Sequence, residues 1–177
     1  MDTSFDSNEH FSFSTENNET ILLRNAAFND ANLIFDLSNE DSVRANSINQ
    51  NIIAWEEHLS WLSNKLNNSN CFFLLAFTKE SRFIGQIRID TNIDEAIIGI
   101  SISQEFRGKG LSTQLLMNSA KLYFEKFASI NNITAKINKN NEPSINTFIK
   151  AGYVFSHTEN INNNEFLVFR LVRNNEV

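Results

Sequence analysis

The spacing of hydrophobic residues predicts two amphipathic helices in the first half of the chain. Between residues 55 and 66, four apolar residues recur at intervals of four, three and four: Trp55, Leu59, Leu62 and Leu66. This spacing places them on one face of a helix. A shorter helix is predicted after Asn29 and Asp30, which can cap its start. Its apolar face would carry Leu33, Ile34 and Leu37.

Period-two alternation predicts strands that are joined by short polar turns. Three neighbouring strands are predicted over residues 71–77, 82–90 and 96–103. In the third, Ile98, Ile100 and Ile102 alternate with Gly99, Ser101 and Ser103. Successive side chains of a strand point to opposite faces, so this strand has one apolar face and one small, polar face.

The remaining pattern completes a mixed order of elements. A first strand is predicted over 20–26, a helix after the glycines with an apolar stripe from Leu115 to Phe127, a strand over 132–138, and two closing strands over 153–159 and 165–172. A last helix has Pro143 in its first turn and Gly152 just past its end, as helix termini favour. The fold class is therefore mixed α/β, with about seven strands and about four helices in a single domain over residues 19–177. Residues 1–18 are polar and are expected to form a loosely ordered arm.

Composition narrows the class of protein further. The 177 residues carry a net charge of −6, which disfavours a broad electrostatic surface for nucleic acid. A single cysteine, Cys71, permits no internal disulfide, and its apolar neighbours predict a buried structural thiol. No apolar run approaches the roughly 20 residues that span a bilayer, and the start of the chain does not resemble a signal peptide. We therefore expect a cytoplasmic protein without membrane or nucleic-acid partners.

The segment RGKG, residues 107–110, lies between the strand over 96–103 and the following helix. A phosphate-binding P-loop is excluded because Lys109 precedes Gly110, and the dinucleotide fingerprint is excluded because Thr113 stands where glycine is required. A helix start leaves backbone N–H groups unpaired, and glycines let an anion approach them. From this segment alone, an anion site and a simple tight turn are equally good interpretations.

Two motifs together resemble the GNAT superfamily of N-acyltransferases. Arg107-x-x-Gly110-x-Ser112 is similar to the acyl-CoA motif of that superfamily. About 30 residues further on, Asn141-x-x-Ser144 leads through Phe148 to Gly152-Tyr153, which resembles its second signature. The order of elements also matches, from about residue 20 to residue 172. The resemblance implies a GNAT-like, mostly antiparallel sheet, acetyl-CoA as co-substrate, and no metal.

The resemblance also implies which residues bind acetyl-CoA. Backbone N–H groups of the loop and the first helical turn would hold the pyrophosphate: Gly108, Lys109, Gly110, Leu111, Ser112 and Thr113. The side chains of Arg107 and Lys109 would add positive charge nearby. Main-chain groups of Ile100, Ser101 and Ile102 would pair with the pantetheine arm. Asn141 would hydrogen-bond that arm, and Ser144 belongs to the same motif. Phe148 would pack near the sulfur of acetyl-CoA.

The sequence does not carry the usual general acid and general base of this superfamily. Many relatives place a tyrosine acid where Phe148 stands, and a glutamate base where Ile97 stands. Phenylalanine has no proton to donate, so solvent or another group must serve. The remaining candidates for proton transfer are His58, Glu95 and Asp90, acting directly or through water. For His58, an exposed or capped histidine on a helix face is the alternative interpretation.

The acceptor is predicted from a further resemblance. Arg44-x-x-Ser47, Glu57-His58-x-x-Trp61 and Gly85-Gln86-x-Arg88-x-Asp90 are similar to GNAT enzymes that acetylate nucleotide-linked deoxyamino sugars of the pseudaminic type. This implies a substrate site formed by Arg44, Ser47, His58, Trp61 and Arg88.

Several alternatives remain beside the sugar nucleotide. One is a protein N-terminus, as in the ribosomal-protein acetyltransferases, and another is a polyamine or aminoglycoside, which would suit the acidic chain. A third is a non-catalytic acyl-CoA sensor, suggested by the missing tyrosine and glutamate. The closing strand over 165–172 either pairs across a homodimer or completes the sheet.

Overall fold

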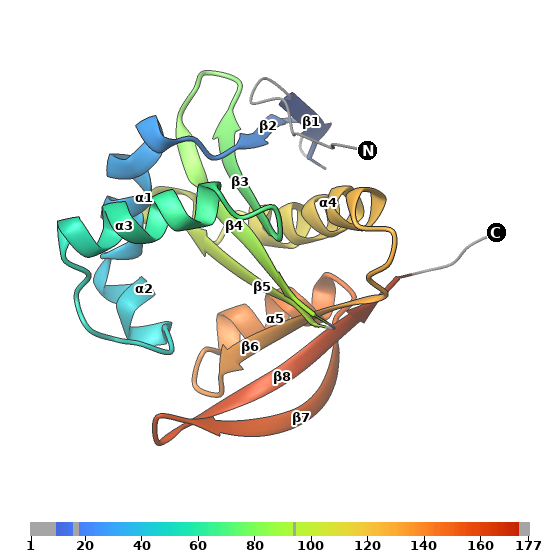
Figure 1. The fold of residues 1–177 in the computed structure, drawn as a ribbon. Helices are drawn as coiled ribbons and strands as arrows, with labels where there is room; N and C mark the ends of the chain where they lie inside the picture. Colours follow the sequence, from blue (N-terminus) through green and yellow to red (C-terminus); the bar gives the residue numbers. More distant parts are fainter. Residues whose placement is uncertain (1–9, 16–17, 94, 174–177) are drawn as a thin grey trace.

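The structure, a computed structural model, describes residues 10–15, 18–93 and 95–173. Within these residues, eight strands form one sheet in the order β1-β2-β3-β4-β5-β6-β8-β7 (Figure 1). The strands are β1 (His10–Ser14), β2 (Thr20–Asn25), β3 (Cys71–Thr78), β4 (Phe83–Asn92), β5 (Glu95–Ile102), β6 (Asn132–Asn138), β7 (Val154–Ile161) and β8 (Asn164–Val172). The α-helices are α1 (Ala31–Ser38), α2 (Asp41–Asn46), α3 (Trp55–Leu66), α4 (Leu111–Lys126) and α5 (Glu142–Lys150). The predicted mixed α/β fold with a mostly antiparallel sheet is confirmed.

The sheet is interrupted between its two parallel strands, β5 and β6. All other neighbouring strands are antiparallel. The parallel ladder joins only residues 96–98 of β5 to residues 133–135 of β6. Beyond these pairs the two strands diverge (Figure 1). We call the diverging segments, residues 99–102 of β5 and 136–138 of β6, the splay.

Two hydrophobic cores lie on opposite faces of the sheet. Along β3, Phe72 and Leu74 belong to one core, whereas Phe73 and Leu75 belong to the other. The larger core packs beneath α4 and includes Phe148 of α5, and the smaller core packs beneath α1 and α3 (Figure 1). This division follows from the period of two in the strands. The face beneath α1 and α3 is also the face on which the polar residues of β4 and β5 lie.

The segment expected to be a loosely ordered arm contains an additional strand. Residues His10–Ser14 pair with β2 as strand β1, so the sheet has eight described strands rather than about seven. Phe11 and Phe13 pack against the larger core, which offsets the polar composition of this segment. The expectation for residues 1–9 and 16–17 lies outside the described residues.

Two further details differ from the sequence prediction. The short helix α2 raises the number of described α-helices to five, rather than about four. On α1, Ile34 and Leu37 are buried as predicted, but Leu33 is exposed. The buried face of α1 is formed by Ala31, Ile34, Leu37 and Ser38, and Leu33 lies outside it.

Strand β8 is an interior strand, paired with β6 on one side and with β7 on the other. Both of its edges are therefore occupied, and the prediction that it could pair across a dimer is wrong. It completes the sheet, and β7 forms the edge of the sheet on this side.

A buried ion pair fixes the turn that leads from β2 into α1. The guanidinium of Arg24 donates two hydrogen bonds to the carboxylate of Asp30, each 2.7 Å long. The same carboxylate accepts the backbone N–H of Ala27 at 2.8 Å. Asp30 is only 6% exposed, so its charge depends on these partners. The side chain thus stabilises the preceding turn rather than capping α1 itself.

Candidate active site

The loop between β5 and α4 has the backbone geometry of an exposed anion site. Gly108 and Gly110 have φ values of 73° and 76°, in the left-handed region that favours glycine. A Cβ at either position would meet no atom within 4 Å, so glycine is required by the backbone and not by crowding. Gly110 is the N-cap of α4 and supplies no capping side chain. The first N–H groups of α4 therefore remain available, as at any uncapped helix start.

The splay leaves main-chain groups of β5 next to this loop without a neighbouring strand on the β6 side. On the other side β5 is fully paired with β4, from Glu95 opposite Asn92 to Ile102 opposite Gly85. Gly85 permits this close approach, since a Cβ there would lie 2.2 Å from the carbonyl oxygen of Ser101. The predicted pantetheine segment, residues 100–102, lies entirely within the splay. Its small, polar face is confirmed, because Gly99 is exposed and a side chain there would meet nothing within 4 Å.

The second predicted motif lies at the start of α5, directly after β6. Asn141 is the N-cap of α5, and its side-chain oxygen accepts the backbone N–H of Ser144 at 3.2 Å. Its amide nitrogen remains available for another acceptor. Phe148 is only 3% exposed and packs edge-on against Tyr153, with ring centroids 4.9 Å apart.

Tyr153 contributes a buried hydroxyl that has no hydrogen-bond partner among the described residues. Burial raises the pKa of this phenol well above its ordinary value. This phenol therefore stays protonated at neutral pH, and its ring lies beside that of Phe148.

Arg107 points away from the loop and toward α2. Its Nε donates to the carbonyl of Ile102 at 2.8 Å, and its Nη1 donates to the hydroxyl of Ser42 at 2.6 Å. The remaining nitrogen pairs with the carboxylate of Glu40. Lys109 is exposed and lies 5.0 Å from the ring centroid of Phe106. Of the two predicted cations, Arg107 has an acidic partner, whereas Lys109 has none within the part of the chain that the structure describes.

A second cluster of polar residues lies on the face beneath α3. The guanidinium of Arg88 lies 5.0 Å from the ring centroid of Trp61, a cation–π geometry. Asp90 accepts a hydrogen bond from Arg88 at 2.8 Å and another from Lys65 at 2.7 Å. Burial opposes the charge on Asp90, but the two cations outweigh it, so the pKa of Asp90 lies below its ordinary value. The structure thus brings together Trp61, Arg88 and Asp90.

The other two candidates for proton transfer are His58, whose ring lies 5.7 Å from that of Trp61 between centroids, and Glu95. His58 is 1% exposed, and its Nε2 lies 2.9 Å from the carbonyl oxygen of Ala31, which makes this nitrogen the donor. Burial lowers the pKa of His58, so the ring is neutral. His58 is therefore buried and hydrogen-bonded, and it does not lie exposed on the helix face as the alternative interpretation expected. Glu95 lies at the start of β5, next to the residues of β5 that pair with β6 and away from the splay.

Arg44 and Ser47 form a separate structural unit at the end of α2. The Nε of Arg44 donates to the carbonyl of Ser38 at 2.6 Å. Its terminal nitrogens donate to the carbonyls of Asn49 and Asn51 at 3.1 and 3.2 Å, and to the hydroxyl of Ser47 at 3.0 Å. These contacts fix the loop over residues 47–53 and leave little of the guanidinium for a ligand.

Gln86 belongs to the motif that suggested the acceptor, but the sequence did not predict it as a site residue. It lies opposite Ser101 in the ladder, is 9% exposed, and has a side-chain oxygen without a partner among the described residues. Its amide nitrogen is 3.3 Å from the hydroxyl of Ser38. A buried polar atom normally has a partner, so this oxygen is a candidate acceptor for a ligand N–H. The sequence signal for this role is its place two residues before Arg88, which puts both side chains on the same face of β4.

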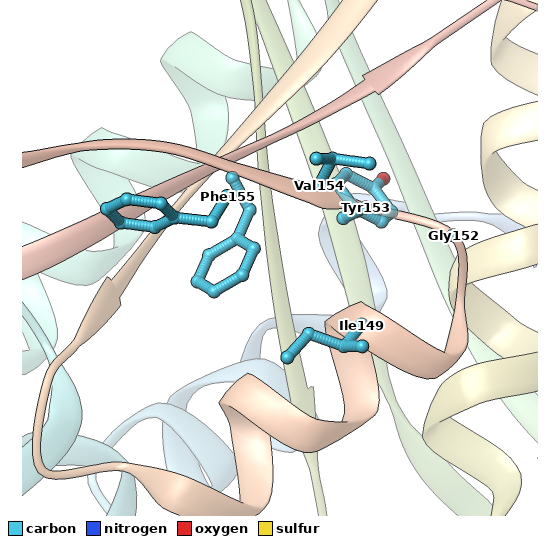
Figure 2. A pocket seen from close by; sticks show the side chains of 6 residues that line it. Ile149, Gly152, Tyr153, Val154 and Phe155 are labelled. Carbon is cyan, nitrogen blue, oxygen red and sulfur yellow. The ribbon is translucent and has the colours of Figure 1, made fainter.

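Two other features lie outside these clusters. Burial, followed by the nearby charge of Asp90, raises the pKa of the Cys71 thiol to about 12, as suits a structural cysteine. Figure 2 shows an open apolar pocket of about 380 Å³ between the end of α5 and the start of β7. It is lined by Ile149, Gly152, Tyr153, Val154, Phe155 and Phe169, none of which is a predicted site residue.

The described part of the chain contains no group of three or more His, Cys, Asp or Glu residues placed to hold a metal ion. Among its helices, none is both long enough and apolar enough to cross a bilayer.

Comparison with known proteins identifies the family. Residues 20–154 match the family model for the acetyltransferase (GNAT) domain. No curated protein matches the sequence significantly. The fold is similar to an uncharacterised protein from Bacillus halodurans, with a TM-score of 0.80 and 17% identity over 96% of this chain and 93% of that one.

Two enzymes with known acceptors share the fold at similarly low identity. Spermidine N-acetyltransferase from Vibrio cholerae, in complex with CoA and spermine, has a TM-score of 0.77 and 16% identity over 86% of this chain and 95% of that one. An aminoglycoside acetyltransferase in complex with coenzyme A has a TM-score of 0.74 and 16% identity over 86% and 93%. Together with the family match over most of its length, the interrupted sheet and the glycine loop before α4 make this chain a member of the GNAT family and an acyl-CoA-dependent N-acetyltransferase.

Proposed function

We propose that the protein transfers an acetyl group from acetyl-CoA directly to a primary amine, in a ternary complex. The observation that carries the proposal is the splay, because it lies beside the glycine loop and can pair with one extended chain. The pyrophosphate would bind the N–H groups of residues 108–113, and Lys109 would add charge. The pantetheine arm would pair with residues 100–102, and the free amide nitrogen of Asn141 would donate to it.

The chain's own groups support transfer without a covalent enzyme intermediate. The amine nitrogen attacks the thioester carbonyl, the carbon–sulfur bond breaks, and an amide and a thiol result. A backbone N–H in the splay can stabilise the oxyanion, and alignment of the two reactants can lower the barrier by roughly 7–11 kcal/mol. Phe148 cannot protonate the thiolate, so water does. Cys71 takes no part, because its high pKa keeps the thiol protonated.

Water is also the proposed route for the proton that leaves the amine. The carboxylate of Asp90 is held by two cations and has a lowered pKa, which makes it a poor base. His58 is enclosed between α1 and α3, and its Nε2 is already bonded. The rate should therefore rise with pH toward the pKa of the bound amine, with no inflection contributed by a histidine.

For the acceptor, we propose the amino group of a nucleotide-linked deoxyamino sugar. Arg88 presents a cation that is fixed by Trp61 and Asp90, on the face where Gly99 leaves open space. A guanidinium held in this way suits a phosphate, and an indole suits a sugar or base ring. Gln86 adds an oxygen that can accept an amine N–H.

A polyamine or aminoglycoside is the second candidate. Two structural neighbours act on such acceptors, as their descriptions state, and the chain carries a net charge of −6. Against it, Arg88 and Lys65 add positive charge where a polycation would have to bind. One acid, Asp90, lies between them, and both cations already pair with it.

A thiol-release assay with acetyl-CoA separates these candidates. The panel would contain UDP-linked 4-amino sugars, spermidine, an aminoglycoside and peptides with free N-termini. We expect turnover on the sugar nucleotides, and a loss of activity on them in Arg88→Gln through a raised KM. Turnover only on spermidine or the aminoglycoside would select the second candidate, and turnover only on peptides would reject both. CoA binding without turnover on any amine would contradict the proposed reaction.

A further inference from the structure

Helix α2 is held by polar contacts instead of hydrophobic packing. None of its six residues, Asp41–Asn46, is buried. Burial of apolar surface is the main force that fixes a helix on a protein, so a helix without it is positioned by its hydrogen bonds and ion pairs. The residues that make those contacts therefore control where α2 lies.

Arg107 provides the contacts at the start of α2. Its guanidinium pairs with Glu40 and donates to Ser42, while its Nε donates to the carbonyl of Ile102 at the end of β5. All three nitrogens are engaged, and the planar geometry of the group makes the arrangement rigid. The backbone of Arg107 leads directly into Gly108. The glycine loop and α2 are thus joined by one side chain.

Further hydrogen bonds continue this connection toward α3. Arg44 of α2 binds the loop over residues 47–53 through carbonyls at Asn49 and Asn51. At the end of the same loop, Asn39 exchanges two hydrogen bonds with the backbone of Ile53, of 2.9 and 3.1 Å. Two residues later α3 begins, the helix that carries Trp61. A series of polar contacts therefore connects the glycine loop, through α2, to the start of α3, on the side where the acceptor is proposed to bind.

We propose that Arg107, with Glu40 and Ser42, is a positioning link through which acyl-CoA binding orders α2 and the 47–53 loop for the acceptor. The proposal rests on the proposed function, because it requires acyl-CoA at the glycine loop. An anion bound to residues 108–113 restricts the backbone next to Arg107. Through the link, that restriction passes to α2, and the effect is reciprocal because a coupling free energy belongs to both sites. Arg107 is thus a positioning residue.

Hydrogen–deuterium exchange of the full chain, with CoA as the probe, tests the link. In the unaltered protein, CoA should slow amide exchange in residues 108–113 and also, by about fivefold, in residues 41–51. In the double variant Glu40→Gln, Ser42→Ala, the protection of 108–113 should remain and that of 41–51 should disappear. Glu105→Gln is the matched control, since it removes another arginine partner near the loop without touching α2. It should behave as the unaltered protein.

The possible outcomes are distinct. Protection of 41–51 that persists in the double variant, or that is absent from the unaltered protein although 108–113 is protected, would overturn the link. If CoA protects no part of 108–113, the proposed acyl-CoA site itself fails. Retained protection of 108–113 shows that the double variant is folded. Glu40→Asp with Ser42 intact keeps both partners and should restore coupling at least in part, a result that loss of folding alone does not predict.

Discussion

Replacing Gly110 by aspartate should weaken CoA binding through charge, and replacing it by asparagine isolates that effect. Gly110 has a φ of 76°, and a Cβ there would meet open space. Asparagine and aspartate are nearly equal in shape and tolerate left-handed backbone better than most residues. Both variants should therefore lose a similar stability, about 1 kcal/mol. Only the aspartate adds a negative charge beside the proposed pyrophosphate site.

The size of the charge effect follows from Coulomb's law. Gly110 is exposed, so the effective dielectric constant lies between about 40 and 80. At about 6 Å from two phosphate charges, the repulsion is then about 1.4–2.8 kcal/mol. This corresponds to a 10- to 100-fold weaker CoA affinity for the aspartate variant than for the asparagine variant, by the relation of roughly 1.4 kcal/mol per tenfold.

Isothermal titration of CoA at low salt measures this difference directly. At about 1 M salt the two variants should differ by less than about threefold, since the Debye length falls to roughly 3 Å. Equal affinities of the aspartate and asparagine variants at low salt would refute the placement of the pyrophosphate at this loop. Thermal unfolding of both variants provides the control that their stabilities are matched.

Three further predictions concern buried and half-buried groups. In denaturant titrations, Asp30→Asn should lower the unfolding free energy by about 3 kcal/mol, because Arg24 loses its buried partner. Glu165→Gln breaks an exposed ion pair and should lower it by less than about 0.5 kcal/mol. At pH 8 the Cys71 thiol should react with a disulfide reagent about a thousandfold more slowly in the native protein than in the unfolded one, because its pKa is raised to about 12 from 9.0. Equal rates in the two states would show an accessible thiolate. Because burial lowers the pKa of His58, the unfolded state binds more protons below pH 6.5, so the unfolding free energy should fall as the pH drops from 7 to 5. In His58→Phe the dependence of the unfolding free energy on pH should be weaker. An unchanged dependence would assign the effect to other groups.

The order and type of the main elements were predictable because each has a strong local pattern. The strand around Ile98 shows this clearly: alternation alone gave its two faces, and the structure places Ile98 in the core and leaves Gly99 exposed. The positions of Gly108 and Gly110 also followed from local requirements, since both need left-handed backbone. These features depend on a few neighbouring residues.

Strand β1 was missed although its sequence carried a signal. Phe11 and Phe13 alternate with polar residues, the period of a strand, but the surrounding Ser and Asn residues resemble a polar arm. The pairing of β1 with β2 decides between the two, and pairing is a long-range property. The same holds for β8: the sequence shows a strand, but not that it lies between β6 and β7.

Side-chain partners across large sequence separations were the least predictable part of the site. Arg107 was expected near a phosphate, yet its partners Glu40 and Ser42 lie 67 and 65 residues earlier. His58 was a candidate base, and only the placement of α1 reveals that its ring is bonded to Ala31. Which polar residue meets which depends on the packing of helices, and no local pattern records it.

The short parallel ladder between β5 and β6 gives this sheet a third edge, inside the molecule. Open edges invite other sheets and lead to aggregation. Here α1 and α4 contact β5 from opposite faces, which leaves no room for a second sheet to approach. We expect that a single extended chain, such as the proposed pantetheine arm, can still pair with β5 at this edge. On this proposal, resistance to edge-to-edge association and preference for an extended, narrow ligand are one property of the architecture.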